Sequence, residues 1–331
     1  MEGHDQQSPG GVVAPPDTVG RYRVEGPLGA GGMGVVYRGF DPELRRPVAL
    51  KRVHPAGTDG KAVRRLRREA QVLARLSHPS IAQIYDVLEG SGTLWIVLEL
   101  IEGASLLKLQ RRRRVSTADR IRCFIKIGEG LAAAHGRGVL HRDLKHENVL
   151  VTADWEVKIL DFGLAISRHL STETLDGRLA GTARAMSPEQ ILGEALDPRS
   201  DLFAFGVLIY ESIAERSPFQ GETVAATVHR VLTEHPPPLV DAVPGTSAAL
   251  SELVESLISK DPADRPGDAQ AAVERLGSIL SALSSEQAWD EQSTVDASAW
   301  TVDKDGGSGP LAPSRWRGLR AALALVLVVI G

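Results

Sequence analysis

The amino-acid sequence predicts an α+β protein with two lobes, a small strand-rich lobe followed by a larger helical one. Between residues 21 and 100, short apolar runs of β-like pattern are separated by glycines and turn residues. The strand-like stretches are 21–55, 81–88 and 94–100, with one stretch of helical periodicity at 61–77. From about residue 105 onward, helix-like segments dominate and are interrupted by one hairpin-like stretch at 149–160. Strands that come first and helices that come later indicate the α+β class.

The length and composition are those of an ordinary globular protein. The chain has 331 residues, against roughly 150 for an average domain, so one large or two ordinary domains are expected. Its 38 Lys and Arg residues and 42 Asp and Glu residues give a formal net charge of −4, which excludes a polybasic nucleic-acid binder. The single cysteine, Cys123, excludes an intramolecular disulfide framework and a Cys-based zinc cluster, and it suits a reducing cytoplasm.

The two ends of the chain differ in composition from the part between them. Residues 1–20 predict a disordered leader and lack the basic and apolar regions of a secretory signal. Residues 283–318 carry acidic side chains among Ser, Thr and Gly and predict a solvated linker. The folded region is expected at 21–282, with its lobes at 21–100 and 101–282.

An apolar stretch follows the linker. Ten apolar residues, 321–330, come after Arg315, Arg317 and Arg320. As a helix they rise about 15 Å, against a hydrocarbon core of roughly 30 Å, so they do not span it as written. One interpretation is a short apolar tail. The other, which we expect, places the start of a truncated transmembrane helix at 319–331, with the arginines keeping the preceding residues in the cytoplasm and 283–318 as a juxtamembrane linker.

A glycine cluster separates the first two strand-like runs. Gly29, Gly31 and Gly34 have the GxGxxG spacing, which a dinucleotide site at a strand–loop–helix turn also uses. The residues that follow, Val35 to Tyr37, favour a strand rather than a helix. The glycines are therefore expected at a hairpin whose backbone N–H groups can cover phosphates, and a plain glycine turn is the alternative.

A lysine and a glutamate come next in the expected small lobe. Period-2 alternation in 48–51 places Ala49 and Lys51 on one face of a strand, and an inward lysine needs an anion. Glu69 falls within the apolar stripe of the helix that follows. A lone carboxylate there would be costly to desolvate, so Lys51 is its expected partner. The alternative is a Glu69 side chain that reaches solvent at the edge of the lobe.

The densest group of polar residues surrounds the expected hairpin at 149–160. His141 to Asn148 precede its first strand, and Asp161 follows its second. Antiparallel pairing brings the residue before one strand and the residue after the other to the same end, which places Asn148 beside Asp161. Two oxygen ligands there predict a Mg²⁺ site that can share phosphate oxygens, with Asp143 five residues earlier in the same loop.

These motifs together resemble a eukaryotic-type (Hanks-type) serine/threonine protein kinase, most similar to the bacterial membrane-anchored subfamily, over about 21–282. The resemblance implies the bilobal protein-kinase fold, with ATP in the cleft between the lobes. It implies ATP contacts from the following residues: Leu28, Gly29, Ala30, Gly31, Gly32, Met33, Gly34, Val36, Ala49, Lys51, Glu69, Glu99 and Ile101. Residues 99–101 would form the hinge.

The resemblance also implies roles in catalysis and in supporting the site. Asp143 would be the catalytic base, Lys145 would reach the γ-phosphate, and Asn148 and Asp161 would hold Mg²⁺, with Mn²⁺ as an alternative ion. The supporting residues would be Arg142 beside the base, Asp201 below the catalytic loop, and Glu189 paired with Arg265. Thr172 and Thr174 are the expected autophosphorylation sites, and self-association in trans would serve that reaction.

Two positions depart from the family pattern, and two other functions are weighed. His146 replaces the usual proline of the catalytic loop and is expected to be harmless, whereas Ala185 replaces a tyrosine and puts the substrate-docking surface in doubt. His141 is expected to be structural.

A pseudokinase is disfavoured by the complete set of catalytic residues, and a small-molecule phosphotransferase by the Ser-Pro-Glu segment at 187–189. The sequence therefore predicts a serine/threonine protein kinase with protein substrates and a role in signal transduction.

Overall fold

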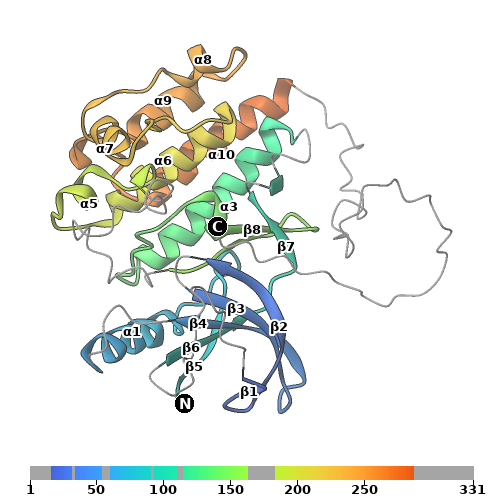
Figure 1. The fold of residues 1–331 in the computed structure, drawn as a ribbon. Coiled ribbons are helices and arrows are strands. Elements are labelled where there is room, and N and C mark those ends of the chain that lie inside the picture. Colours follow the sequence, from blue (N-terminus) through green and yellow to red (C-terminus); the bar gives the residue numbers. More distant parts are fainter. Residues whose placement is uncertain are drawn as a thin grey trace, which may run out of the picture.

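A curled antiparallel sheet forms the N-terminal lobe in the computed structural model, which describes residues 16–31, 34–53, 60–90, 93–106, 108–109, 115–162 and 183–286. The six strands lie in the order β1-β2-β3-β4-β6-β5, and helix α1 accompanies them (Figure 1). Their bounds are β1 (Thr18–Val19), β2 (Tyr22–Gly31), β3 (Gly34–Asp41), β4 (Arg46–Val53), α1 (Gly60–Leu73), β5 (Ile84–Gly90) and β6 (Thr93–Glu99). Helical residues follow in the second lobe, which confirms the predicted α+β fold.

The alternation predicted for β4 separates two faces of this sheet. Val48 and Leu50 are fully buried in an apolar cluster with Trp95 of β6. Ala49 lies on the opposite face and packs with Val36 of β3 in a separate cluster. Because successive side chains of a strand point to opposite faces, Lys51 shares the face of Ala49.

A second, three-stranded sheet lies where the lobes meet. Its strands are β7 (Gly103–Ser105), β8 (Val149–Thr152) and β9 (Val157–Ile159), in that order. The β8–β9 pair is the hairpin expected from the sequence. The strand expected to begin at Ile81 instead begins at Ile84, because the backbone of residues 80–82 is bonded to Ile159 of β9. That contact joins the end of the α1 region to the second sheet.

The C-terminal lobe is built around one buried helix. Helix α6 runs through it, and residues 200–210 of this helix are all buried. Asp197 caps its first turn and Pro198 takes the first helical position, where a missing N–H costs nothing. The helices of this lobe are α3 (Thr117–His135), α5 (Pro188–Leu192), α6 (Pro198–Ala214), α7 (Val224–Thr233), α8 (Leu239–Ala242), α9 (Ala248–Leu257), α10 (Ala269–Glu286) and the short helices η1 (His146–Asn148) and η2 (Pro262–Asp264).

Several expectations concern parts of the chain that the structure does not describe. Residues 1–15 of the leader expected at 1–20, most of the linker and the apolar stretch at 321–330 fall outside the described residues. The end of the expected leader is instead part of the sheet, because Thr18 and Val19 form β1 and pair with β2. Within the described ranges, no helix combines the length and the apolar character that crossing a membrane requires.

Candidate active site

A cleft that is partly open to solvent lies between the two lobes. Its lining residues are Val36, Ala49, Lys51, Leu98, Glu99, Ile101, Leu150, Leu160 and Asp161. Val36, Ala49 and Ile101 were expected here from the sequence. Leu150 and Leu160 were not expected here. The alternation of β8 could have identified Leu150, because its neighbours Val149 and Val151 face the main core and Leu150 therefore faces the other way. The lining is mainly apolar, as a flat aromatic ligand requires, and it also contains the charged side chains of Lys51, Glu99 and Asp161.

The glycine-rich turn joins β2 to β3, the strand from which Val36 lines the cleft. Gly31 pairs with Gly34 across the hairpin, so the expected strand–turn–strand arrangement is present. Gly34 has φ +134°, and a Cβ atom there would lie 1.9 Å from the carbonyl oxygen of Arg52. Only glycine fits that position. Leu28 and Gly29 belong to β2, the side chain of Ala30 is not described, and Gly32 and Met33 fall outside the described residues.

Lys51 points into the cleft and meets a carboxylate from the other lobe. Its side chain is 2% exposed, and its Nζ lies 2.6 Å from Asp161 Oδ2. A buried ammonium group needs such a partner. The ion pair links β4 of the first lobe to Asp161, two residues after the end of β9. Glu69 lies half-buried on α1, and its expected pairing with Lys51 stays a prediction.

Glu99, an expected hinge residue, is held in place through its side chain. Lys158 of β9 places its Nζ 2.9 Å and 3.0 Å from the two carboxylate oxygens of Glu99, and the backbone N–H of Gln83 donates to one of them. The Glu99 carboxylate is therefore engaged by Lys158 and Gln83. The sequence did not single out either partner, because the contacts join residues that are 59 and 16 positions apart.

Three polar residues of the catalytic loop meet in one hydrogen-bonded group. Asn148 donates from Nδ2 to the backbone oxygen of Asp143 at 2.7 Å and to Asp143 Oδ2 at 3.1 Å. Lys145 Nζ lies 3.2 Å from the same Oδ2. Because the amide nitrogen of Asn148 is engaged, its Oδ1 is the atom left to bind a cation. The group orients Asp143 from two sides.

Asn148 and Asp161 lie at the same end of the β8–β9 hairpin. The N–H of Leu160 donates to the Asn148 carbonyl at 2.8 Å, which places Asp161 next in the chain. Among the described residues, no three His, Cys, Asp or Glu side chains could hold a metal together. A carboxylate and an amide oxygen are hard ligands that suit Mg²⁺, and a bound nucleotide would supply the remaining oxygens. The two residues therefore fit an ion that arrives with phosphates.

Asp201 of α6 supports the catalytic loop from below. Its two oxygens accept hydrogen bonds from the backbone N–H groups of His141 at 2.7 Å and Arg142 at 2.8 Å, and His135 Nε2 lies 2.8 Å away. Burial raises the pKa of Asp201, but the hydrogen bond and charge of His135 outweigh it, so the pKa is lowered overall. The ionised carboxylate holds Arg142 at φ +67°, a conformation that few side chains adopt.

His141 is buried and hydrogen-bonded at both ring nitrogens. Its Nε2 lies 2.9 Å from the carbonyl oxygen of Leu160, and its Nδ1 lies 3.2 Å from the N–H of Asp143. A carbonyl only accepts and an N–H only donates, so the neutral ring with its proton on Nε2 satisfies both contacts. Burial lowers the pKa of His141 in agreement with this. The ring also packs on Phe162, with centroids 4.6 Å apart.

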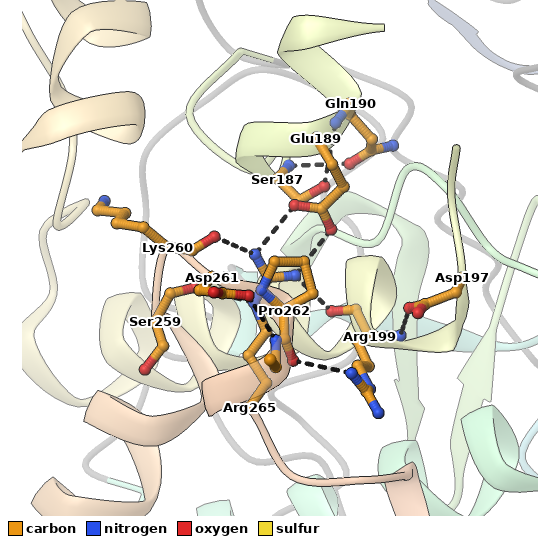
Figure 2. Close-up of polar contacts among 11 residues, drawn as sticks. Ser187, Glu189, Gln190, Asp197, Arg199, Ser259, Lys260, Asp261, Pro262 and Arg265 are labelled. Carbon is orange, nitrogen blue, oxygen red and sulfur yellow. Dashed lines mark hydrogen bonds and ion pairs between the residues drawn. The ribbon is translucent and has the colours of Figure 1, made fainter. Parts of the chain in front are cut away.

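Figure 2 shows the support beneath α5. Arg265 donates to both carboxylate oxygens of Glu189, at 2.7 Å and 2.9 Å. Gln190 closes a capping box with Ser187. Its Nε2 donates to the carbonyl oxygen of Arg142 at 2.8 Å. The Glu189–Arg265 pair was expected from the sequence, whereas Gln190 was not. The Gln190 contact fixes α5 relative to the loop that carries Asp143, and the Glu189–Arg265 pair fixes α5 to the loop between α9 and α10.

His146 has more contacts than the sequence led us to expect. We expected the replacement of proline at this position to be without consequence, because the residue touches no ligand. The structure instead buries its side chain against Glu211 and Ser212 of α6. The expected phosphorylation sites Thr172 and Thr174 fall outside the described residues, as does the whole of 163–182.

Comparison with known proteins gives consistent matches over the same part of the chain. The family described as "Protein kinase domain" matches residues 22–276. The chain is 36% identical over 274 residues to the serine/threonine-protein kinase PknL of Mycobacterium tuberculosis, a match that covers 82% of this chain and 67% of that protein. It is also 36% identical over 272 residues to pkn3 of Myxococcus xanthus, with 78% of this chain and 50% of that protein covered. A match to PknA of M. tuberculosis is 36% identical and covers 74% and 58%.

Proposed function

The chain belongs to the protein kinase family, and we propose that it transfers the γ-phosphoryl group of ATP to Ser and Thr hydroxyls of proteins. The observation that carries the proposal is the meeting of Lys51, Asp143, Asn148 and Asp161 at one end of the cleft. The printed names of PknL, pkn3 and PknA, all serine/threonine-protein kinases, support the same acceptor class.

ATP would bind in the interlobe cleft. The adenine would lie between Val36 and Ala49 on one side and Leu150 on the other, since these apolar side chains line the cleft from above and below. The glycine-rich turn of β2 and β3 would cover the phosphates with backbone N–H groups. Lys51 would bind the α- and β-phosphates, which gives its buried charge an anionic partner besides Asp161.

Asn148 and Asp161 would hold Mg²⁺ through Asn148 Oδ1 and the Asp161 carboxylate. When bound, the ion would neutralise negative charge on the phosphates. Asp161 then has two cationic neighbours, because Lys51 Nζ lies 2.6 Å from one of its oxygens. This arrangement orients the carboxylate toward the phosphates.

Asp143 would accept the proton of the acceptor hydroxyl. The hydroxyl oxygen forms a bond to the γ-phosphorus, the bond from that phosphorus to the bridging oxygen breaks, and ADP leaves. Asn148 and Lys145 hold the Asp143 carboxylate in place for this step, and Lys145 would also reach the γ-phosphate. Positioning and charge neutralisation would supply most of the rate enhancement.

The acceptor hydroxyls would be those of Ser and Thr rather than Tyr. Lys145 lies two residues after Asp143, a position at which tyrosine kinases that resemble this chain usually carry another residue. Thr182 has the sequence position of a hydroxyl that can bond Asp143 and Lys145 in Ser/Thr kinases. Phosphoamino-acid analysis of the products tests this, and a predominance of phosphotyrosine would contradict it.

Two other functions give different results in a single assay. Purified protein is incubated with radiolabelled Mg-ATP and with a generic protein acceptor, such as casein, or with small alcohols such as choline, and a Lys51→Met variant serves as control. A protein kinase labels the protein acceptor, a small-molecule phosphotransferase labels only the alcohols, and a pseudokinase labels neither. Label on protein that disappears in Lys51→Met supports the proposal, and either other pattern contradicts it.

Membrane attachment and self-association are separate proposals that rest on the sequence. The apolar residues after Arg320 suggest attachment through a C-terminal helix, and phosphorylation of one copy by another would need transient self-association. Expressing the chain with its native downstream residues and fractionating cells tests the first. A protein wholly in the non-membrane fraction would contradict attachment.

A further inference from the structure

A buried histidine of the catalytic loop ties that loop to the central helix of the lobe. His146 is the first residue of η1, three positions after Asp143, and its side chain is 3% exposed. Its Nδ1 lies 3.1 Å from Glu211 Oε2, and its Nε2 lies 2.8 Å from Ser212 Oγ. Both partners are on α6, the helix that also supplies Asp201. The mechanism proposed above uses neither contact.

Glu211 continues the connection to the segment that precedes α5. Its Oε1 lies 3.5 Å from Arg184 Nε, and Arg184 Nη2 lies 3.6 Å from Glu147 Oε1. Glu147 follows His146 directly in η1, so the backbone between them closes these three side-chain contacts into a ring. This ring, His146–Glu211–Arg184–Glu147, joins three parts of the lobe: the catalytic loop, α6 and residues 183–187.

The order Ser212–His146–Glu211 has the form of a hydrolase triad, but it cannot work as one. Ser212 is fully buried in α6, so no substrate carbonyl can reach its Oγ. A nucleophile also needs donors for the developing oxyanion beside it, and a serine inside a helix has its neighbouring N–H groups in helical hydrogen bonds. The arrangement therefore serves to hold the imidazole rather than to activate the serine.

The two ring nitrogens of His146 have different partners, and the partners are not equivalent. The Glu211 carboxylate accepts from Nδ1, and this bond has an ionised acceptor, which makes it the stronger of the two. Burial raises the pKa of Glu211, but the hydrogen bond from His146 outweighs it and lowers the pKa overall. The ionised Glu211 can then hold the Arg184 guanidinium. The bond to Ser212 orients the ring but does not reach Arg184.

On the basis of the proposed kinase function, we infer that His146 is a positioning residue for the protein acceptor. By holding Glu211, it fixes Arg184 and residues 183–187 relative to Asp143, where the acceptor hydroxyl must arrive. Arg184 is 26% exposed in its side chain, so the far side of the ring reaches the surface next to the loop. The cleft-lining residues are not part of the ring, so ATP binding stays independent of it.

Substitution of His146 by Asn or by Gln tests the two hydrogen bonds of the imidazole one at a time. The amide of Asn takes the place of Nδ1 and can still donate to Glu211, whereas the amide of Gln takes the place of Nε2 and keeps only Ser212. His146→Asn, His146→Gln, Arg184→Met and the double variant His146→Gln with Arg184→Met are compared with wild type. The measurements are KM for casein, KM for ATP, kcat and the urea midpoint of unfolding.

The inference predicts that His146→Gln and Arg184→Met each raise KM for the protein acceptor about tenfold, as loss of one charge-assisted contact does. KM for ATP stays unchanged, His146→Asn stays close to wild type, and the double variant is no worse than either single one. Equal behaviour of Asn and Gln, or a parallel rise in KM for ATP, overturns the inference. If wild type labels no protein acceptor, the kinase proposal itself fails and the inference falls with it.

Discussion

Arg265 clamps Glu189 with two parallel hydrogen bonds, across 76 positions of the sequence and with both residues buried. The remaining guanidinium hydrogens of Arg265 go to the backbone oxygens of Ser259, Lys260 and Arg199. A fully bonded guanidinium compensates for the desolvation of both charges. Through this clamp, the start of α5 is fixed to the loop between α9 and α10.

Removal of one partner should therefore destabilise the fold strongly. Arg265→Ala leaves the Glu189 carboxylate buried without its cation, and we expect it to lower the free energy of unfolding by about 3–5 kcal/mol. Urea denaturation followed by circular dichroism measures the change. The matched control is Arg230→Ala, which breaks an exposed pair with Glu234 and should cost less than about 1 kcal/mol. Equal losses of unfolding free energy in both variants would show that the buried pair contributes no more to stability than the exposed one.

The burial of a neutral His141 predicts acid sensitivity. Because burial lowers its pKa in the folded state, the unfolded chain binds more protons as the pH falls below about 6.5, the ordinary value for histidine. The free energy of unfolding should therefore decrease from pH 7.5 to pH 5.5. Protonation would also place an N–H of the ring against the N–H of Asp143. Asp201, whose pKa is lowered, contributes a further loss only below about pH 4.

The test compares pH dependence rather than stability at one pH. Thermal unfolding between pH 5.5 and pH 7.5 should show a smaller pH-dependent loss in His141→Gln than in wild type, whatever the absolute stability of the variant. His229→Gln is the control for the substitution itself, since His229 is exposed. The same slope in His141→Gln and wild type would contradict a neutral buried ring.

Phosphorylation of the segment after Asp161 should activate the enzyme. Arg142 stands beside Asp143, and its buried Nε has no hydrogen-bond partner among the described residues. A phosphate on Thr172 or Thr174 would supply acceptor oxygens and about two negative charges for this guanidinium. Mass spectrometry after incubation with Mg-ATP should find phosphate on one or both threonines. The variant with both threonines changed to alanine should lose most activity, and an unmodified segment in a fully active enzyme would rule the idea out.

The parts that the sequence predicted depend on local pattern. Alternation placed Lys51 on the cleft face of β4, and the paired apolar runs placed Asn148 and Asp161 at one end of a hairpin. The expected Glu189–Arg265 pair came from a family resemblance rather than from spacing. Gln190, Lys158 and the surroundings of His146 were missed, because their partners are 48 to 66 positions away. Strand β7 was missed because three residues carry no readable period.

The proton-accepting role of Asp143 is the centre of the account, and single-turnover transfer by Asp143→Asn measures it most directly. Asn keeps the size of the side chain and the contact with Asn148 but cannot take the hydroxyl proton. The account predicts that phosphate transfer to a protein acceptor falls by about 10²–10⁴-fold, while the dissociation constant for Mg-ATP and the urea midpoint stay close to wild type. Transfer at close to the wild-type rate, with ATP bound equally well, would contradict it.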